Sequence, residues 1–264
     1  MDVKAASDNC ILAANVPDFC LEEVSEHTMG LILALTRGIV KLNSIVKAGE
    51  WNFHPDPEIQ KNIWPKLVRI NKLKLGLIGF GQIPRALVPN AKGFNLEIMA
   101  YDPYADRKLF DDLGVIRVEL DQLLIESDIV SVHCPLTDET RHMIGSRELE
   151  KMKPSAYLIN TARGPVIDTD ALYSALSKRK LAGAGLDVIE PEPIPKDHPL
   201  LKLDNVIITA HGGGVSNTSM EMLVMRPYEN MVRLLKGEWP TGLLNPEIKD
   251  KYTKKWGNSV CQTG

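Results

Sequence analysis

Cysteine is scarce in this sequence, and its few copies lie far apart. The four cysteines (Cys10, Cys20, Cys134 and Cys261) form no CxxC pair. Their spacing therefore predicts neither a metal-binding cysteine motif nor a disulfide framework. Reduced cysteines are typical of cytoplasmic proteins, so we expect a cytoplasmic location and no bound metal ion.

An excess of charge and long apolar runs are also lacking. The net charge of −3 gives no electrostatic reason to expect nucleic acid or an anionic membrane as a partner. No apolar run is long enough to span a bilayer, and no charged-then-apolar leader follows Met1. These absences favour a soluble protein, and 264 residues suffice for one large α/β domain or two modest ones.

Short apolar segments alternate with amphipathic segments over most of the chain. Strands are expected at 74–78, 97–101, 128–132, 156–160, 182–186 and 206–209. Helices are expected at 82–92, 120–126, 146–152, 168–177 and 216–235, the last interrupted by Pro227. Short apolar strands separated by helices are typical of a parallel sheet covered on both faces. The pattern predicts an α/β protein with a doubly wound parallel sheet.

A strongly helical pattern precedes the first expected strand. Apolar residues recur at steps of three and four from Leu21 to Val46, with Gly49 beyond the end. Ile32 and Val40 fall outside the main apolar stripe. This second apolar face indicates packing against another domain or subunit, or else ordinary core burial.

The segments outside these patterns are less regular. A short helix is expected at 3–7 and a strand at 11–14. Residues 50–72 contain three prolines and are expected to be irregular. The tail after Pro240 is polar and is expected to be loosely ordered.

A glycine-rich turn joins the first expected strand to the next helix. Gly79 permits a tight turn, and Gly81 lets the backbone approach a pyrophosphate at the helix N-terminus. Asp102 ends the following strand, where a carboxylate can accept hydrogen bonds from the adenosine ribose and repel a 2′-phosphate. Pro84 replaces the usual third glycine, which a first helical turn tolerates, whereas Pro89 is expected to bend the helix. The turn therefore predicts a Rossmann-type fold that binds NAD rather than NADP.

Several motifs occur in the order found in one known family. They are Glu26-His27-Thr28, the glycine turn, Tyr101-Asp102-Pro103, His133-Cys134-Pro135-Leu136-Thr137, Asn160-Thr161-Ala162-Arg163-Gly164, Gly185-Leu186-Asp187-Val188 with Glu190-Pro191-Glu192-Pro193, and His211-Gly212-Gly213. With these motifs the sequence resembles the D-isomer-specific 2-hydroxyacid dehydrogenases from about Val16 to Asn245. The resemblance implies an oxidoreductase that transfers a hydride between NAD(H) and a small D-2-hydroxy acid or 2-oxo acid.

The resemblance implies three catalytic residues. Arg163 would bind the substrate carboxylate and carbonyl through its planar fork of donors; a structural salt bridge is the alternative. His211 would exchange a proton with the substrate oxygen, since a free imidazole titrates near pH ~6.5. Glu192 would hydrogen-bond His211 and stabilise its protonated form; a solvated loop carboxylate is the alternative.

A cofactor site is implied in the same way. Its residues would be Gly79, Gly81, Gln82, Ile83, Asp102, His133, Cys134, Pro135, Thr161, Ala162, Asp187 and Gly213. Asp187 would contact the nicotinamide carboxamide, the backbone around Thr161 and Ala162 would help set the ring face, and His133 would form part of the cofactor wall. His27 is interpreted as structural.

The resemblance also divides the chain. Residues 1–20 resemble only the end of a substrate lobe, 21–215 the NAD-binding domain, and 216–264 a helix and tail that return toward the substrate lobe. A shortened substrate lobe would leave the site without one wall and without the closure that excludes water during reaction.

Two other functions stay open alongside the dehydrogenase. One is an NAD-binding dimer with a regulatory or binding role and impaired or absent catalysis. The other is a truncated relic that binds NAD weakly. The apolar helix at 21–46 favours a homodimer in any case, and Glu192, where formate-oxidising relatives usually carry glutamine, favours a hydroxy acid over formate.

Overall fold

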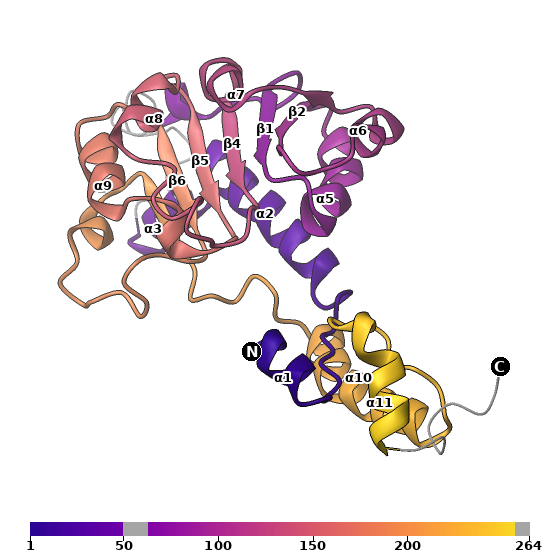
Figure 1. Ribbon diagram of the computed structural model, residues 1–264. Helices are drawn as coiled ribbons and strands as arrows, with labels where there is room; N and C mark the ends of the chain where they lie inside the picture. The colour runs from indigo at the N-terminus through magenta and orange to yellow at the C-terminus, as the bar shows by residue number, and fades with distance from the viewer. Residues whose placement is uncertain (50–62, 257–264) are drawn as a thin grey trace. The chain divides into compact units, whose positions relative to one another are not determined.

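The computed structural model describes residues 1–49 and 63–256 (Figure 1). The chain divides into two compact units, one formed by Leu21–Gly213 and the other by Met1–Cys20 together with Gly214–Gly264. Most of the segment expected to be irregular, residues 50–62, lies outside the described residues.

The larger unit is built on a parallel sheet. Its described strands are β1 (Lys74–Ile78), β2 (Glu97–Tyr101), β3 (Ile116–Arg117), β4 (Ile129–Val132), β5 (Tyr157–Asn160), β6 (Gly183–Leu186) and β7 (Val206–Ile208). They lie in the order β3-β2-β1-β4-β5-β6-β7, and every neighbouring pair is parallel. The chain therefore winds outward in both directions from the β1–β4 pair, which confirms the predicted doubly wound, Rossmann-type sheet.

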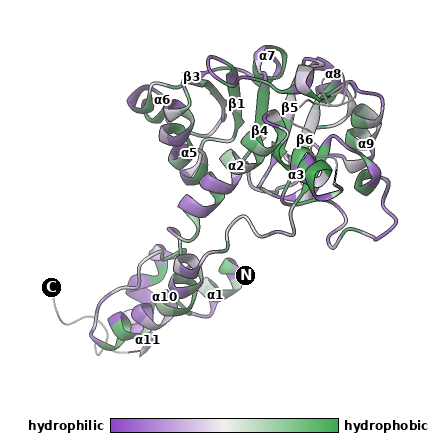
Figure 2. Cartoon of the chain, turned by 180° about the vertical axis from the view of Figure 1, so that it is seen from behind, coloured by the Kyte–Doolittle hydropathy of each residue, from purple (hydrophilic) through white to green (hydrophobic). Residues whose placement is uncertain are grey.

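Helices cover both faces of this sheet (Figure 1). They are α2 (Leu21–Thr36), α3 (Ile39–Lys47), η1 (Trp64–Lys66), α5 (Gln82–Gly93), α6 (Arg107–Leu113), α7 (Leu120–Glu126), α8 (Ser146–Lys151), η2 (Gly164–Val166), α9 (Thr169–Ser177) and η3 (Pro199–Lys202). Leu75 and Leu77 of β1 pack in a core with α2, α5 and α6, whereas Val130 and Val132 of β4 pack with α7, α8 and α9. Because both faces are buried, these strands are mainly apolar, as the colouring of β1 and β4 in Figure 2 shows.

The prediction of a single helix at 21–46 is wrong. The chain forms α2 and α3, which are bent by 61° at a break. Gly38 lies at that break with φ +61°, in the left-handed region that favours glycine. The two residues outside the apolar stripe consequently differ: Ile32 on α2 is fully buried in the core, but Val40 on α3 is 49% exposed.

No single helix in the described parts of the chain is both long and apolar enough to cross a membrane. The bent pair of α2 and α3 has the length and apolar composition of a membrane span only when the two helices are taken together.

The smaller unit holds α1 (Val3–Asp8), α10 (Asn217–Leu235), η4 (Pro246–Ile248) and α11 (Lys249–Trp256). The predicted interruption at Pro227 is wrong, since α10 continues through it. α5 contains Pro89 in its interior, and Pro84 occupies its first turn as expected. A proline removes one intrahelical hydrogen bond, and these helices of 19 and 12 residues persist despite that loss.

The described part of the tail, residues 241–256, is also more ordered than predicted. Asn245 is fully buried; its Oδ1 accepts from the amide of Ala13 at 2.9 Å and its Nδ2 donates to the carbonyl of Ile11 at 2.9 Å. These bonds tie the tail to the first residues of the chain. The strand expected at 11–14 is wrong, because that segment forms only one bridge, between Ala14 and Leu243.

We predict that Gly76→Ala destabilises the larger unit. A Cβ at Gly76 of β1 would lie 2.3 Å from Oγ of Ser127 and 2.6 Å from the side chain of Leu123 on α7. Overpacking of this kind costs about 1–3 kcal/mol, measured by urea unfolding. Gly93→Ala at the end of α5 is the matched control, since nothing lies within 4 Å of its added Cβ. Equal stabilities of the two variants would contradict this packing.

Candidate active site

The turn after β1 requires glycine at one position. Gly79 has φ +91°, and a Cβ there would lie 2.8 Å from the amide nitrogen of Cys134 and 2.9 Å from the carbonyl carbon of His133. Its own amide donates to the carbonyl of Tyr101 at 2.8 Å. Gly81 precedes α5 as its N-cap, and nothing lies within 4 Å of where its Cβ would be. The turn thus packs tightly against β4 on one side and leaves the backbone at the helix N-terminus open to a ligand.

Asp102 fixes the end of β2 beside this turn. Its Oδ2 accepts from the amide of Phe80 at 2.8 Å, and its Oδ1 accepts from the amides of Tyr104 at 2.9 Å and Ala105 at 3.0 Å. The carboxylate therefore joins the glycine turn to the loop after β2. Asp102 thus lies at the end of β2, where the sequence placed it.

A cavity of about 610 Å³ opens at the carboxyl ends of β1, β2 and β4. Its lining comprises Ile78, Gly79, Tyr101, Asp102, Pro103, Tyr104, Cys134, Pro135, Thr137, Asp138, Glu139, Thr140 and Met143. This is where the strand order reverses, the place at which open α/β sheets bind their ligands. Four predicted cofactor residues line it: Gly79, Asp102, Cys134 and Pro135.

Sequence reasoning missed the outer wall of this cavity. The hydroxyl of Tyr104 donates to Oε2 of Glu139 at 2.5 Å, and this carboxylate raises the pKa of the Tyr104 phenol. The two residues come from separate loops, and neither belongs to a motif, so no sequence signal marks the pair.

The two residues that follow β4, His133 and Cys134, are both uncharged near pH 7. Burial lowers the pKa of His133 to about 4 and raises the pKa of the Cys134 thiol to about 11. Nε2 of His133 lies 2.8 Å from the hydroxyl oxygen of Ser131. His133 does not line the cavity itself. It follows β4 and directly precedes Cys134, which does line the cavity.

Arg163 lies in the loop after β5, which Asn160 shapes. Oδ1 of Asn160 accepts from the amide of Ala162, and its Nδ2 donates to the carbonyl of Arg163, both at 3.0 Å. The guanidinium of Arg163 is exposed and donates through one nitrogen to the carbonyl of Ala162 at 2.6 Å. Thr161 is buried under this loop.

Glu192 and His211 lie together. Oε1 of Glu192 is 2.6 Å from Nδ1 of His211, and the two side chains are 43% and 49% exposed. His211 follows β7 and has φ +51°, a left-handed conformation that is uncommon outside glycine. Glu192 thus engages Nδ1 of the imidazole, and no hydrogen bond to Nε2 is found among the described residues.

Asp187 follows β6 and is 4% exposed. Its oxygens accept from the amides of Gly212 at 3.0 Å and Gly213 at 2.9 Å. Although burial acts to raise it, the pKa of Asp187 lies well below its usual range, because hydrogen bonds from His27, Thr209 and Gly213 stabilise the carboxylate. Asp187 is thus ionised and engaged with the turn that follows His211.

The predicted site residues all lie at one edge of the sheet. Those of the nucleotide turn follow β1, with Gln82 and Ile83 starting α5; Asp102 follows β2, and His133 to Pro135 follow β4. Arg163 follows β5, Asp187 and Glu192 follow β6, and His211 and Gly213 follow β7. No cluster of three or more metal-binding side chains occurs among residues 1–49 and 63–256.

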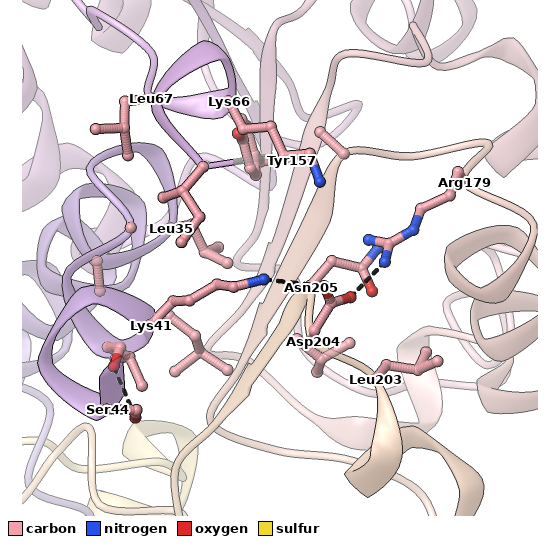
Figure 3. A pocket seen from close by; sticks show the side chains of 17 residues that line it. Leu35, Lys41, Ser44, Lys66, Leu67, Tyr157, Arg179, Leu203, Asp204 and Asn205 are labelled. Atoms are coloured by element: carbon pink, nitrogen blue, oxygen red, sulfur yellow. Dashed lines mark hydrogen bonds and ion pairs between the residues drawn. The ribbon is translucent and has the colours of Figure 1, made fainter. Parts of the chain in front are cut away.

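A second cavity, of about 350 Å³, lies at the opposite edge, at the amino ends of β5 and β7 (Figure 3). Two cations of its lining, Lys41 and Arg179, both form ion pairs with Asp204. No predicted site residue lines it.

Comparison with known proteins identifies the family. The model of the D-isomer specific 2-hydroxyacid dehydrogenase NAD-binding domain matches residues 29–213. The chain belongs to this family. It is 39% identical over 250 residues to a glyoxylate reductase of Korarchaeum cryptofilum, covering 94% of this chain and 73% of that protein. It is 38% identical over 257 residues to a D-3-phosphoglycerate dehydrogenase of Methanocaldococcus jannaschii, covering 97% of this chain and 47% of that protein.

A solved relative with cofactor is similar in structure. The D-lactate dehydrogenase of Aquifex aeolicus, complexed with NAD and lactic acid, superposes with a TM-score of 0.77 at 35% identity, covering 90% of this chain and 73% of that chain. The chain is thus an NAD-dependent dehydrogenase of the 2-hydroxyacid family. The open turn at Gly81 and the cavity beside Asp102 fit the dinucleotide.

We predict that acid destabilises the larger unit through His133. With a folded pKa of about 4 against 6.5 for the free side chain, only the unfolded state takes up the proton as pH falls from 6.5 to 4. The stability held by the neutral imidazole is present above pH 6.5 and is lost across this window, by at most about 3 kcal/mol. Urea unfolding at pH 7 and pH 4.5 should show a larger loss for the wild type than for His133→Gln. Equal losses would contradict the prediction.

Proposed function

We propose that this chain transfers a hydride between NAD(H) and a small D-2-hydroxy acid or 2-oxo acid, with Arg163, His211 and Glu192 acting on the substrate. The observation that carries the proposal is the 2.6 Å contact between Glu192 and His211 at the edge where the nucleotide turn lies. A carboxylate attached to one imidazole nitrogen orients the ring and leaves the other nitrogen for a substrate.

His211 acts as the general acid and base in this proposal. During reduction Nε2 gives its proton to the substrate oxygen at C2, and during oxidation it takes that proton back. Glu192 stabilises the imidazolium through Nδ1. NAD, when bound, supplies or accepts the hydride.

Arg163 binds the substrate carboxylate. Only one of its guanidinium nitrogens has a protein partner with a described hydrogen bond, the carbonyl of Ala162, so the remaining donors can form a planar, bidentate pair with a carboxylate. Gly164, next to it, packs so closely that a Cβ there would lie 2.2 Å from the carbonyl of Ile189. This contact supports the proposal because it joins the arginine loop to the segment that leads to Glu192.

Small 2-oxo acids are the substrates to test first. Relatives carry the names glyoxylate reductase and D-3-phosphoglycerate dehydrogenase, and both names imply a carboxylate beside a hydroxyl or carbonyl carbon. We further propose that Asp187 contacts the nicotinamide and that Thr161 and Ala162 set the face of its ring. A division of the chain after residues 20 and 215 and a cytoplasmic location are also proposed.

We predict that His211→Ala lowers kcat for NADH-dependent reduction of glyoxylate or pyruvate by about 10²–10⁴-fold, because the proton donor is lost. Arg163→Ala should mainly raise KM for the acid. Tryptophan-to-NADH energy transfer should show unchanged NADH binding in both. His142→Ala is the matched control, since His142 is a half-exposed histidine paired with Glu190 at 2.5 Å. Undiminished turnover in both site variants would reject the assigned roles.

We also propose a homodimer, formed through α3. Ile39, Val40 and Val46 are 53%, 49% and 41% exposed on this helix, an apolar face that a second copy would cover. A dimer that binds NADH without turnover would instead support the regulatory or binding role.

Light scattering after gel filtration tests this assembly. The wild type is predicted to elute with twice the mass of one chain, and Val40→Glu to elute as a monomer, because a buried charge disfavours the contact. Ile125→Glu, at a 55% exposed position on α7, should leave the dimer intact. A wild-type monomer at every concentration, with or without NADH, would refute the dimer.

A further inference from the structure

The carboxylate of Asp187 accepts hydrogen bonds from residues on both sides of His211 in the loop after β7. Oδ1 of Asp187 accepts from the hydroxyl of Thr209 at 2.5 Å and from the amide of Gly212 at 3.0 Å, and Oδ2 accepts from the amide of Gly213 at 2.9 Å. The carbonyl of Asp187 accepts from the amide of His211 itself at 2.9 Å. These bonds hold His211 in its left-handed conformation, which few residues adopt unaided.

His27 of α2 extends this network from outside the loop. Its Nε2 lies 2.9 Å from Oγ1 of Thr209 and 3.4 Å from Oδ1 of Asp187. An ionised carboxylate only accepts, so the single hydroxyl proton of Thr209 goes to Asp187. The contact between His27 and Thr209 must therefore be donated by Nε2–H of His27, which fixes the position of that proton.

The packing around this donor is tight. A Cβ at Gly213 would lie 2.7 Å from Oδ2 of Asp187 and 3.1 Å from Cδ2 of His27. The ring of His27 is thus wedged directly against the loop that follows His211.

The next residue of α2 reaches the arginine loop. Oγ1 of Thr28 donates to the carbonyl of Val24 at 2.7 Å and lies 3.0 Å from Oγ1 of Thr161. Because the one proton of Thr28 is used on Val24, Thr161 donates this second bond. Both threonines are buried, Thr28 completely. Consecutive residues of α2 therefore contact the loops of His211 and Arg163.

We propose that His27 and Thr28 are positioning residues that set the spacing of the two catalytic loops, His27 holding His211 through Thr209 and Asp187, and Thr28 holding Arg163 through Thr161. This inference rests on the proposed roles of His211 and Arg163. It gives the Glu26-His27-Thr28 motif a function in place of the purely structural role expected for His27.

Thr209→Val tests the part of the proposal that concerns His27 and His211, since it removes the hydroxyl of Thr209 and keeps the shape of the side chain. We expect kcat to fall by about tenfold or more, because small displacements of a catalytic group are costly, with unchanged NADH binding and an altered pH profile of kcat. Thr209→Ser, which keeps the hydroxyl, should retain most of the wild-type kcat. His27→Phe, a ring without the donor, should behave like Thr209→Val and serves if the valine variant does not fold.

Thr28→Val tests the arginine arm and has a matched control on the same helix. Thr36 is also fully buried and also donates to the carbonyl four residues back, that of Ile32, at 2.7 Å. Thr28→Val should raise KM for the 2-oxo acid several-fold, whereas Thr36→Val should lower thermal stability similarly and leave KM unchanged. Equal KM values in the two variants would overturn this arm.

Imidazole NMR signals test whether Thr209 and His27 position His211, and they do not require activity. In the free protein, Thr209→Val should shift or broaden the signals of His211, assigned with His211→Ala, while the signals of His142 stay in place. Unchanged His211 signals in Thr209→Val, or equal perturbation by Thr209→Ser, would overturn the inference. If the wild type shows no turnover but these NMR changes are present, the result would count against the proposed reaction and not against the positioning of His211.

Discussion

Parallel pairing of the strands is the constraint on which the site depends. Because every described neighbour in the order β3-β2-β1-β4-β5-β6-β7 is parallel, the carboxyl ends of all the strands lie at one edge. Loops that are far apart in the sequence are thereby brought to that edge. The continuous apolar cores on both faces of the sheet supply the stability that the exposed loops do not.

The edge is divided into two chemically different halves. Around β1, β2 and β4 the buried side chains of His133 and Cys134 are both uncharged near pH 7, and the carboxylate of Asp102 accepts from the amide of Phe80 in the glycine turn. Around β5, β6 and β7 lie the guanidinium of Arg163, the carboxylate of Asp187, and the hydrogen-bonded pair of Glu192 and His211. A dinucleotide needs close backbone approach at the first half, whereas proton transfer needs an ionisable group at the second.

The sequence predicted much of this arrangement because its signals are local. The strand at 74–78 and the glycine turn are set by adjacent apolar residues and by the need for positive φ at Gly79. Asn245 and the break at Gly38 were missed for the opposite reason. One buried amide that bonds Ala13 leaves no periodic pattern, and the helical stripe of apolar residues continues across the bend at Gly38. Tyr104 and Glu139 were missed because they meet only in space. His27 carried a motif signal, but its partners Asp187 and Thr209 follow β6 and β7, far from it in the sequence.

The account turns on whether Arg163 and His211 act on one substrate molecule. A crystal structure of the chain with NADH and oxamate, a non-reducible analogue of a 2-oxo acid, tests this most directly. The account predicts the oxamate carboxylate on the guanidinium of Arg163 and its carbonyl oxygen within hydrogen-bond distance of Nε2 of His211. Oxamate bound away from these two side chains, with NADH in place at the glycine turn, would contradict it.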